Sequence, residues 1–323
     1  MRALGIGEIL WDLLPGGPRL GGAPFNVVAH LNRFGHGVRY ATAVGDDELG
    51  RRALDILAAE GIGRELVRVL PGRPTGTASV VVDRRGSPEF AIATGVAWEE
   101  LALDPAALAE TIAWSPDAIV FGTVAQRRQP IVAWTRRLLS ALPSPVRLYD
   151  VNLRTDGWEP ALLEELASLA TVLKLSRSEM EVVAGLGWGT TRTPEAFARA
   201  ASARFGLRAV CITFGADGAG LLLDGDYLAA RPPAVEVVDT VGSGDAFAAA
   251  LRSRRRCSTA CSAADRPPTS WRARSPSAPS WPRARAPFRP GRRRTSSEWR
   301  GRDIVPDGQP CRRYAGTVDP LVV

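Results

Sequence analysis

The chain has 323 residues, of which 45% are hydrophobic and 23% charged, and this composition is typical of a globular protein rather than a disordered one. It holds no run of the roughly 18 consecutive apolar residues that a membrane helix needs. The first residues, MRALGIGEIL, predict a strand and not a secretory leader, so we expect a cytoplasmic protein. Four Cys and two His leave little material for a disulfide framework or a His/Cys metal site.

The positive charge is confined to one end of the chain. Residues 252–323 contain 17 Arg and 5 acidic residues, a net charge of +12, whereas residues 1–251 contain 24 basic and 29 acidic residues, a net charge of −5. The basic character of the whole chain therefore says nothing about what residues 1–251 bind.

Within residues 1–251, strand-like runs alternate with helix-like stretches. The expected strands are 3–8, 38–44, 117–122, 146–152, 171–176 and 208–214. Helices are expected at about 25–34, 47–60, 104–113, 129–141, 159–169, 177–184 and 194–204. Several strands are apolar on both faces, as in a parallel sheet with helices on each side, so the sequence predicts a doubly wound α/β fold.

Residues 75–96 interrupt this alternation. The run TGTASVVVDRRGSPEFAIAT predicts two strands around an Arg-Arg-Gly turn, and the Pro- and Gly-rich segment at about 11–24 could pair beside them. We expect these two segments to form a small β lid on the mostly parallel sheet.

One short segment predicts an anion site. The chain lacks a Gly-x-x-x-x-Gly-Lys-Ser/Thr loop, and a Gly-x-Gly-x-x-Gly turn does not follow the first strand, which argues against a P-loop or a dinucleotide fold. Instead, DTVGSGD at residues 239–245 precedes a helix-like AFAAAL run. Its glycines allow backbone N–H groups to converge at a helix N-terminus, beside an Asp that could accept a hydroxyl proton. A helix-capping turn is the alternative interpretation.

Further motifs occur in order along the chain, in residues 7–12, 20–26, 43–50, 150–154, 213–218 and 239–245. Together they resemble the PfkB carbohydrate kinase family, the ribokinase-like sugar kinases. The resemblance implies ATP-dependent phosphorylation of a primary hydroxyl group, with Asp245 as the base and the amides of Gly242, Ser243 and Gly244 stabilising the transferred phosphoryl group. It also implies two binding sets: Asp12, Gly22, Asn26 and Arg154 for the sugar, and Thr213, Gly215, Gly218, Asp239 and Thr240 for the nucleotide.

The resemblance implies ATP and Mg²⁺ as cofactors, with K⁺ as a further cation of the family. Glu179 matches the acidic residue of the family's Asn-x-x-Glu motif, which arranges water around the metal, whereas Ser176 replaces the Asn. Structural interpretations stay open for several of these residues, since Asp12 could be a turn residue, Asn26 a helix cap, and residues 213–218 a tight turn. Arg154 follows a strand at the edge where doubly wound sheets bind ligands, so we expect it to have an anionic partner.

The segments 74–77, 96–98 and 152–154 resemble fructokinases most closely. Ribokinase, adenosine kinase and ketodeoxygluconate kinase remain alternative activities. The β lid could also pair with the lid of a second copy and form a homodimer. The expected partners are therefore a small sugar and ATP.

Residues 252–323 do not match the family. They are rich in Arg, Pro and Ser, hold 10 Pro and three of the four Cys, and show no amphipathic period. By composition they would be disordered, and nucleic-acid binding through Arg and Trp is an interpretation that we do not favour.

We favour a shift of reading frame near codon 251, which would replace the C-terminal helices of the family. Because folded domains are stable by only about 5–15 kcal/mol, we expect a poorly stable chain with little or no kinase activity. The alternative function is an inactive sugar-binding protein that interacts through its basic tail.

Overall fold

The computed structural model describes residues 1–14, 16–82, 88–142, 145–154 and 157–231, together with Asp245 and Ala248. All of these residues belong to one compact unit, Met1–Arg256. The tail that the sequence sets apart, residues 252–323, lies outside the described residues. Within the described ranges, every helix is too short or too polar to cross a membrane.

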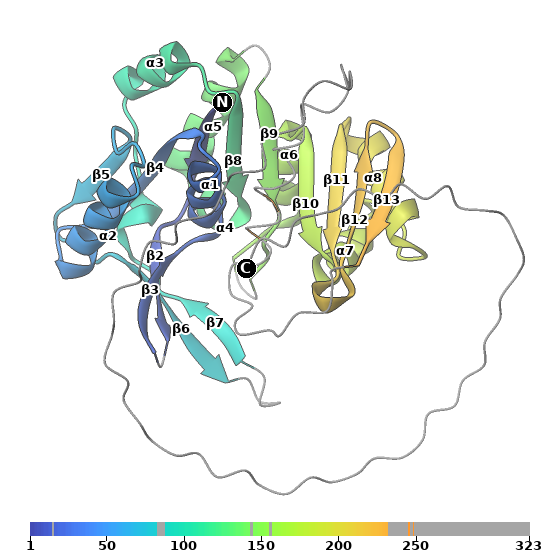
Figure 1. Cartoon of the computed structure of the whole chain (residues 1–323), viewed down its shortest axis with the longest axis horizontal. Helices are drawn as coiled ribbons and strands as arrows, with labels where there is room; N and C mark the ends of the chain where they lie inside the picture. Colours follow the sequence, from blue (N-terminus) through green and yellow to red (C-terminus); the bar gives the residue numbers. More distant parts are fainter. Residues whose placement is uncertain are drawn as a thin grey trace, which may run out of the picture. The chain divides into compact units, whose positions relative to one another are not determined.

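A nine-stranded sheet forms the centre of the described chain (Figure 1). Its order is β13-β12-β11-β10-β9-β8-β1-β4-β5, in which neighbours from β11 to β5 are parallel and the pairs of β12 are antiparallel. From β1 the chain first adds β4 and β5 on one side and then returns to add β8 on the other, so the direction of the strand order reverses between β1 and β8. The strands are β1 (Arg2–Ile6), β4 (Gly37–Gly45), β5 (Val67–Leu70), β8 (Ala118–Gly122), β9 (Val146–Asp150), β10 (Val172–Ser176), β11 (Ala209–Thr213), β12 (Ala219–Leu223) and β13 (Asp226–Ala230).

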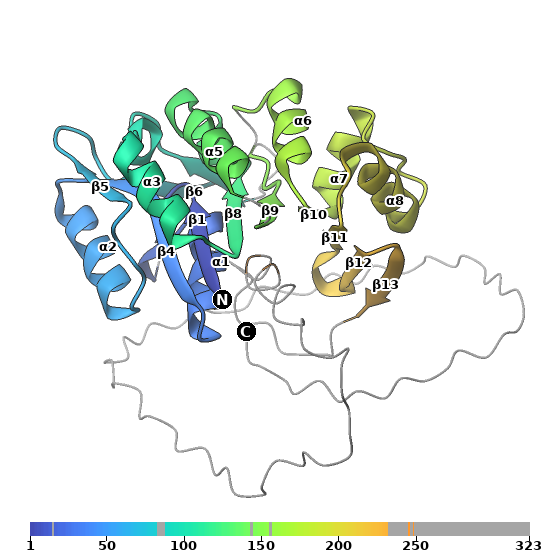
Figure 2. The ribbon, with the colours of Figure 1, turned by 90° about the horizontal axis from the view of Figure 1, so that it is seen from above.

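Helices cover both faces of this sheet, and Figure 2 shows α3, α5 and α6 on one side and α1 on the other. The helices are α1 (Ala23–Arg33), α2 (Glu48–Ala59), α3 (Pro105–Trp114), α4 (Thr123–Gln126), α5 (Gln129–Ala141), α6 (Pro160–Leu169), α7 (Arg177–Gly185) and α8 (Pro194–Phe205), with short 3₁₀ turns η1 (Ala97–Glu100) and η2 (Gly215–Asp217). Leu4 and Ile119 belong to a core with α3, α5, α6, α7 and α8, whereas Ala3 and Val120 belong to a core with α1 and α2. Alternate residues of the central strands β1 and β8 thus enter opposite cores, which confirms the predicted doubly wound α/β fold.

A second, four-stranded sheet of order β3-β2-β6-β7 extends from the body of the chain (Figure 1). Its strands are β2 (Leu10–Leu14), β3 (Gly17–Gly21), β6 (Gly76–Val82) and β7 (Pro88–Ile92). The two hairpins join through a parallel β2–β6 pair. The segments predicted at 11–24 and 75–96 therefore pair as expected, although β7 ends at Ile92; this four-stranded sheet is called the β lid below.

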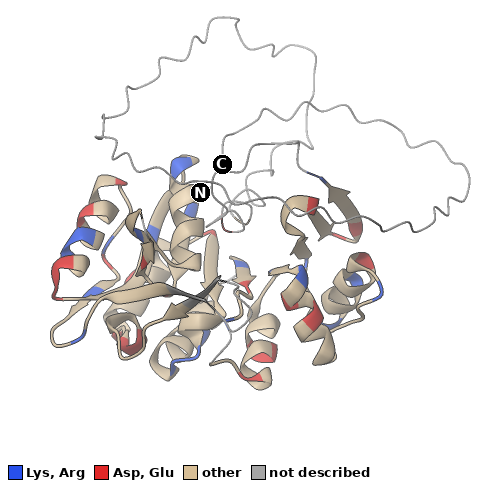
Figure 3. Cartoon of the chain, turned by 90° about the horizontal axis from the view of Figure 1, so that it is seen from below, with Lys and Arg blue, Asp and Glu red and all other residues tan. Residues whose placement is uncertain are grey.

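Local side-chain caps explain where several helices begin. The Asp47 carboxylate accepts a hydrogen bond from the Gly50 N–H at 2.7 Å at the start of α2, and Asp104 caps α3 in the same way. On the outer surfaces, basic and acidic residues alternate along the helices (Figure 3), and ion pairs such as Arg136–Glu165 join neighbouring elements. This mixed surface agrees with the slightly negative charge of residues 1–251.

Candidate active site

The candidate site lies at the carboxyl ends of the parallel strands, where the β lid begins. Doubly wound sheets bind ligands at this edge, at the point where the strand order reverses. Here the reversal falls between β1 and β8, and β1 leads within four residues into β2 of the β lid. The topology therefore selects the same part of the molecule as the sequence motifs do.

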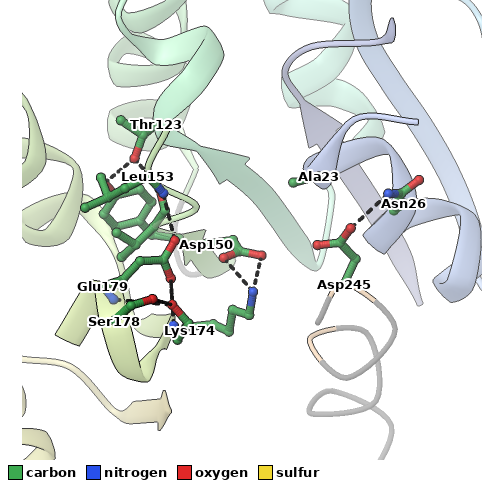
Figure 4. A network of polar contacts seen from close by, with 12 residues as sticks. Ala23, Asn26, Thr123, Asp150, Leu153, Lys174, Ser178, Glu179 and Asp245 are labelled. Carbon is green, nitrogen blue, oxygen red and sulfur yellow. Dashed lines mark hydrogen bonds and ion pairs between the residues drawn. The ribbon is translucent and has the colours of Figure 1, made fainter. Parts of the chain in front are cut away.

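Asp245 and Asn26 are in direct contact (Figure 4). Asn26 lies in the first turn of α1, and its Nδ2 donates a hydrogen bond to Asp245 Oδ2 over 2.8 Å. Burial raises the pKa of Asp245, while the hydrogen bond from Asn26 and the charges of Lys174, Arg154 and His30 oppose this rise. The fold thus brings a predicted base and a predicted sugar-binding residue together, although they stand 219 positions apart in the sequence.

Gly22 makes the tight turn before α1. Its φ is 122°, and a Cβ at this position would lie 2.3 Å from the carbonyl oxygen of Glu8, so the turn needs a glycine. Glu8 is buried, and its Oε1 accepts a hydrogen bond from the Ala23 N–H at 3.2 Å. Burial raises the pKa of Glu8 to about 7. The sequence motifs indicate no role for Glu8, whereas in the structure its carboxyl group supports the turn in which Gly22 lies.

Asp12 of β2 and Arg154, which follows β9, belong to the same electrostatic environment. Burial raises the pKa of Asp12, the positive charge of Arg154 opposes this rise, and the negative charge of Asp245 adds to it. Arg154 acts in the same direction on Glu8 and on Asp245. The positive charge of Arg154 therefore acts on three carboxylates of the site, those of Glu8, Asp12 and Asp245.

The turn that carries Arg154 is held by neighbouring strands and by α7. The Val151 carbonyl oxygen accepts a hydrogen bond from the Thr123 hydroxyl at the end of β8. The Leu153 N–H donates to Glu179 Oε1 at 2.7 Å (Figure 4). These bonds fix the backbone on both sides of the turn and so limit where Arg154 can lie.

Glu179 and Ser176 form a capping box at the start of α7. The Ser176 hydroxyl accepts a hydrogen bond from the Glu179 N–H, and Glu179 Oε2 accepts one from the Ser176 N–H at 2.6 Å. Since Oε1 accepts a hydrogen bond from the Leu153 N–H, both carboxylate oxygens of Glu179 accept hydrogen bonds from the backbone. Ser176, which stands where the family has Asn, is thus the N-cap of α7, and the Ser-x-x-Glu spacing of residues 176–179 is the sequence pattern of such a cap. Among the described residues, no group of three or more His, Cys, Asp and Glu side chains could hold a metal ion.

The predicted nucleotide residues are only partly described. Thr213 ends β11, and Gly215 and Gly218 border η2 with φ values of 60° and 103°. A Cβ on Gly218 would lie 2.0 Å from the carbonyl oxygen of Ala230, so this glycine is required by the fold. Around Gly215, the described residues other than its chain neighbours place no atom within 4 Å of the Cβ position. The remaining predicted residues of the phosphate segment, Asp239, Thr240, Gly242, Ser243 and Gly244, lie outside the described residues.

Thr75 and Asp47 join the β lid to the main sheet. Thr75 Oγ1 accepts a hydrogen bond from the Gly45 N–H at 2.9 Å and donates one to Asp47 at 2.6 Å, and the Thr75 N–H donates to the same carboxylate at 2.7 Å. Burial opposes ionisation of Asp47, but these hydrogen bonds and the one from Gly50 lower its pKa overall. Segments 43–50 and 74–77, which carry part of the family resemblance, thus join the end of β4 to the start of β6.

Known proteins resemble this chain in sequence and in fold. The family model described as pfkB family carbohydrate kinase matches residues 18–255. A fructokinase of Klebsiella pneumoniae is 30% identical over 262 residues, which cover 76% of this chain and 81% of that protein. An uncharacterized sugar kinase of Pyrococcus horikoshii, solved in complex with ATP, superposes with a TM-score of 0.64 and 25% identity over 77% of this chain and 83% of that one. A fructokinase of Vibrio cholerae, solved with fructose, ADP and calcium ion bound, gives a TM-score of 0.63 and 25% identity over 77% and 82% of the two chains.

Proposed function

Because the chain belongs to the pfkB family of carbohydrate kinases, we propose that it transfers the γ-phosphoryl group of ATP to a primary hydroxyl group of fructose. The observation that carries this proposal is the hydrogen bond from Asn26 to Asp245, which joins a sugar-binding residue to the base. The choice of fructose is supported by the Klebsiella relative and by the fructose-bound Vibrio structure.

In this proposal Asp245 accepts the proton of the sugar hydroxyl as it attacks. Burial raises the pKa of Asp245 toward the pH at which a general base is most effective, and Asn26 orients the carboxylate. The turn at Gly22 and the side chains of Asp12 and Arg154 bind the remaining hydroxyl groups. The amides of Gly242, Ser243 and Gly244 would hold the charge of the transferred group.

ATP supplies the phosphoryl group, and the Mg²⁺ that accompanies it neutralises phosphate charge. We place the nucleotide against residues 213–218, where the open space around Gly215 leaves room for a ligand, and against Asp239 and Thr240. Since both carboxylate oxygens of Glu179 already accept backbone hydrogen bonds, we propose that Glu179 contacts the Mg²⁺ only through water. No described residue argues for a K⁺ site.

The test is a substrate comparison with the purified full chain. Formation of ADP from ATP and Mg²⁺ is followed with fructose, ribose, adenosine and ketodeoxygluconate, and sugar binding is measured by calorimetry because we expect residues 252–323 to reduce turnover. Fructose should give the highest kcat/KM, and Asp245→Asn should lower it by at least about 100-fold. Asp226→Asn, on the exposed strand β13, is the matched control and should change nothing.

Two results would contradict the proposal. A higher kcat/KM with another acceptor would make fructose the wrong substrate. Fructose binding without any turnover would favour the inactive sugar-binding protein instead.

A further inference from the structure

Lys174 lies on β10, and its side chain points to the face of the sheet that Asp245 occupies. Its neighbours Leu173 and Leu175 both enter the core that holds α7 and α8. Since side chains alternate along a strand, Lys174 points to the opposite face, which carries α1 and Ala248. Its partners in register are Asp150 on β9 and Cys211 on β11.

The ammonium group of Lys174 forms a buried ion pair. Lys174 Nζ lies 2.9 Å and 3.0 Å from the two carboxylate oxygens of Asp150 (Figure 4). The exposed fractions are 7% for Lys174 and 0% for Asp150, so solvent screens this pair very little. Asp150 is the last residue of β9 and directly precedes residues 151–154, the turn that carries Arg154.

Stability alone does not account for this pair. A buried ion pair is costly to desolvate, and apolar residues of similar size commonly give an equally stable protein. The chain also contains a single Lys among 41 Lys and Arg residues. A compact ammonium group fits where a planar guanidinium would need more room, so the use of Lys at this position indicates a specific requirement.

Lys174 faces more than one carboxylate. The titratable groups around it are Asp150 of β9, Cys211 of β11, Glu179 of α7 and Asp245. Burial on its own would lower the pKa of Lys174, but the negative charges of Asp150, Asp245 and Glu179 together raise it. The ammonium group therefore stays charged, and its positive charge acts on all three of these carboxylates.

We propose, on the basis of the function proposed above, that Lys174 is a positioning residue for phosphoryl transfer. Its ammonium group fixes the Asp150 carboxylate at the end of β9 and so the start of the turn that carries Arg154. It also supplies positive charge to the face on which Asp245 accepts the proton of the sugar.

The pH dependence of kcat/KM tests this role. K174M removes the positive charge and keeps the length of the side chain, which should raise the pKa of Asp245. The acid limb of the kcat/KM profile, where activity is lost as Asp245 becomes protonated, should therefore move to higher pH by roughly one unit. K174R restores the charge in a larger, planar group, so it should return the limb only part of the way toward its original position. The double variant K174M/D150N no longer leaves a carboxylate unpaired, so it should melt closer to the wild-type Tm than K174M does. Its limb should be displaced less than that of K174M, because the negative charge of Asp150 near Asp245 is lost as well. A folded K174M protein with an unmoved limb would overturn the proposal, because a purely structural role lowers the rate without shifting the limb.

A second measurement is independent of turnover. Labelling with ¹⁵N-lysine gives one side-chain ammonium signal, from Lys174, because the chain holds no other Lys. Asp245→Asn should shift this signal and the exposed Asp226→Asn should not. Turnover with an unmoved limb and an unmoved signal would reject the role of Lys174 alone. A signal that moves in a protein that phosphorylates no sugar would reject the proposed function, and with it the role in phosphoryl transfer.

Discussion

Replacement of Asn26 by Leu removes the hydrogen bond from Nδ2 to Asp245 Oδ2 and keeps a side chain of similar volume on α1. The donor stabilises the ionised carboxylate, which is the form that accepts a proton. Burial already raises the pKa of Asp245, so the loss of this donor should raise it further.

The size of the shift follows from the bond. A hydrogen bond to a charged group contributes about 1.5–3 kcal/mol, and one pKa unit corresponds to about 1.4 kcal/mol. The pKa of Asp245 should therefore rise by about one to two units in Asn26→Leu. Because activity needs the ionised form, it should be lost at a correspondingly higher pH as the solution is acidified.

The assay is the pH profile of kcat/KM for fructose. The control is Asn32→Leu on the same helix, since Asn32 donates to the Glu60 carbonyl oxygen and not to Asp245. An acid limb that stays at the wild-type pH in Asn26→Leu, with the rate at high pH also unchanged, would refute the assignment of Asn26 and Asp245 to one site.

Other parts of the account make separate predictions. Glu8 has a pKa of about 7 in the folded chain against an ordinary value of 4.5, so folding favours its protonated form, and the free energy of unfolding should fall by about 3 kcal/mol as the pH rises from 4.5 past 7. Urea unfolding at pH 5 and pH 8 should show a smaller fall in Glu8→Gln than in the wild type, since the raised pKa values of Asp12, Asp150 and Asp245 contribute to the fall in both proteins; an equal fall in both would contradict the prediction. Thr75→Val leaves the Gly45 N–H without its acceptor and removes the hydroxyl that donates to Asp47, whose carboxylate keeps the backbone N–H donors of residues 50 and 75. It should lower the free energy of unfolding by about 1–3 kcal/mol, whereas Thr75→Ser should lower it less. Resequencing of the coding DNA across codons 240–323 should reveal one inserted or deleted base that restores an apolar, helical C-terminus; a confirmed frame would refute the proposed frameshift.

The strand and helix pattern could be predicted because it depends on local sequence. Both-sided apolar runs such as residues 117–122 can be stable only inside a sheet that is covered on both faces. Helix boundaries fell within two residues because Asp47 and Asp104 cap α2 and α3 in the ordinary way. The antiparallel pair β12 and β13 was missed, although Asp224 and Gly225, with φ values of 50° and 94°, form the Asp-Gly turn that is typical of two-residue hairpins.

The contacts inside the site could not be predicted in the same way. The pairing of Lys174 with Asp150 depends on the register between β10 and β9, which the sequence does not specify. The role of Glu8 depends on the close approach of the turn before α1 to its backbone and side chain. Residues 12 and 26 could be named beforehand only because their motifs resemble a family, whereas the glycine-rich segment 239–245 also indicated Asp245 by its own chemistry.

The most direct test of the central claim is the identity of the product. The full chain is incubated with fructose, ATP and Mg²⁺, and the reaction is followed by ³¹P NMR for a phosphate ester on a primary carbon. The account predicts a fructose phosphate that accumulates with the wild type, however slowly, and not with Asp245→Asn. Formation of inorganic phosphate alone, or of the same ester at an equal rate by Asp245→Asn, would contradict it.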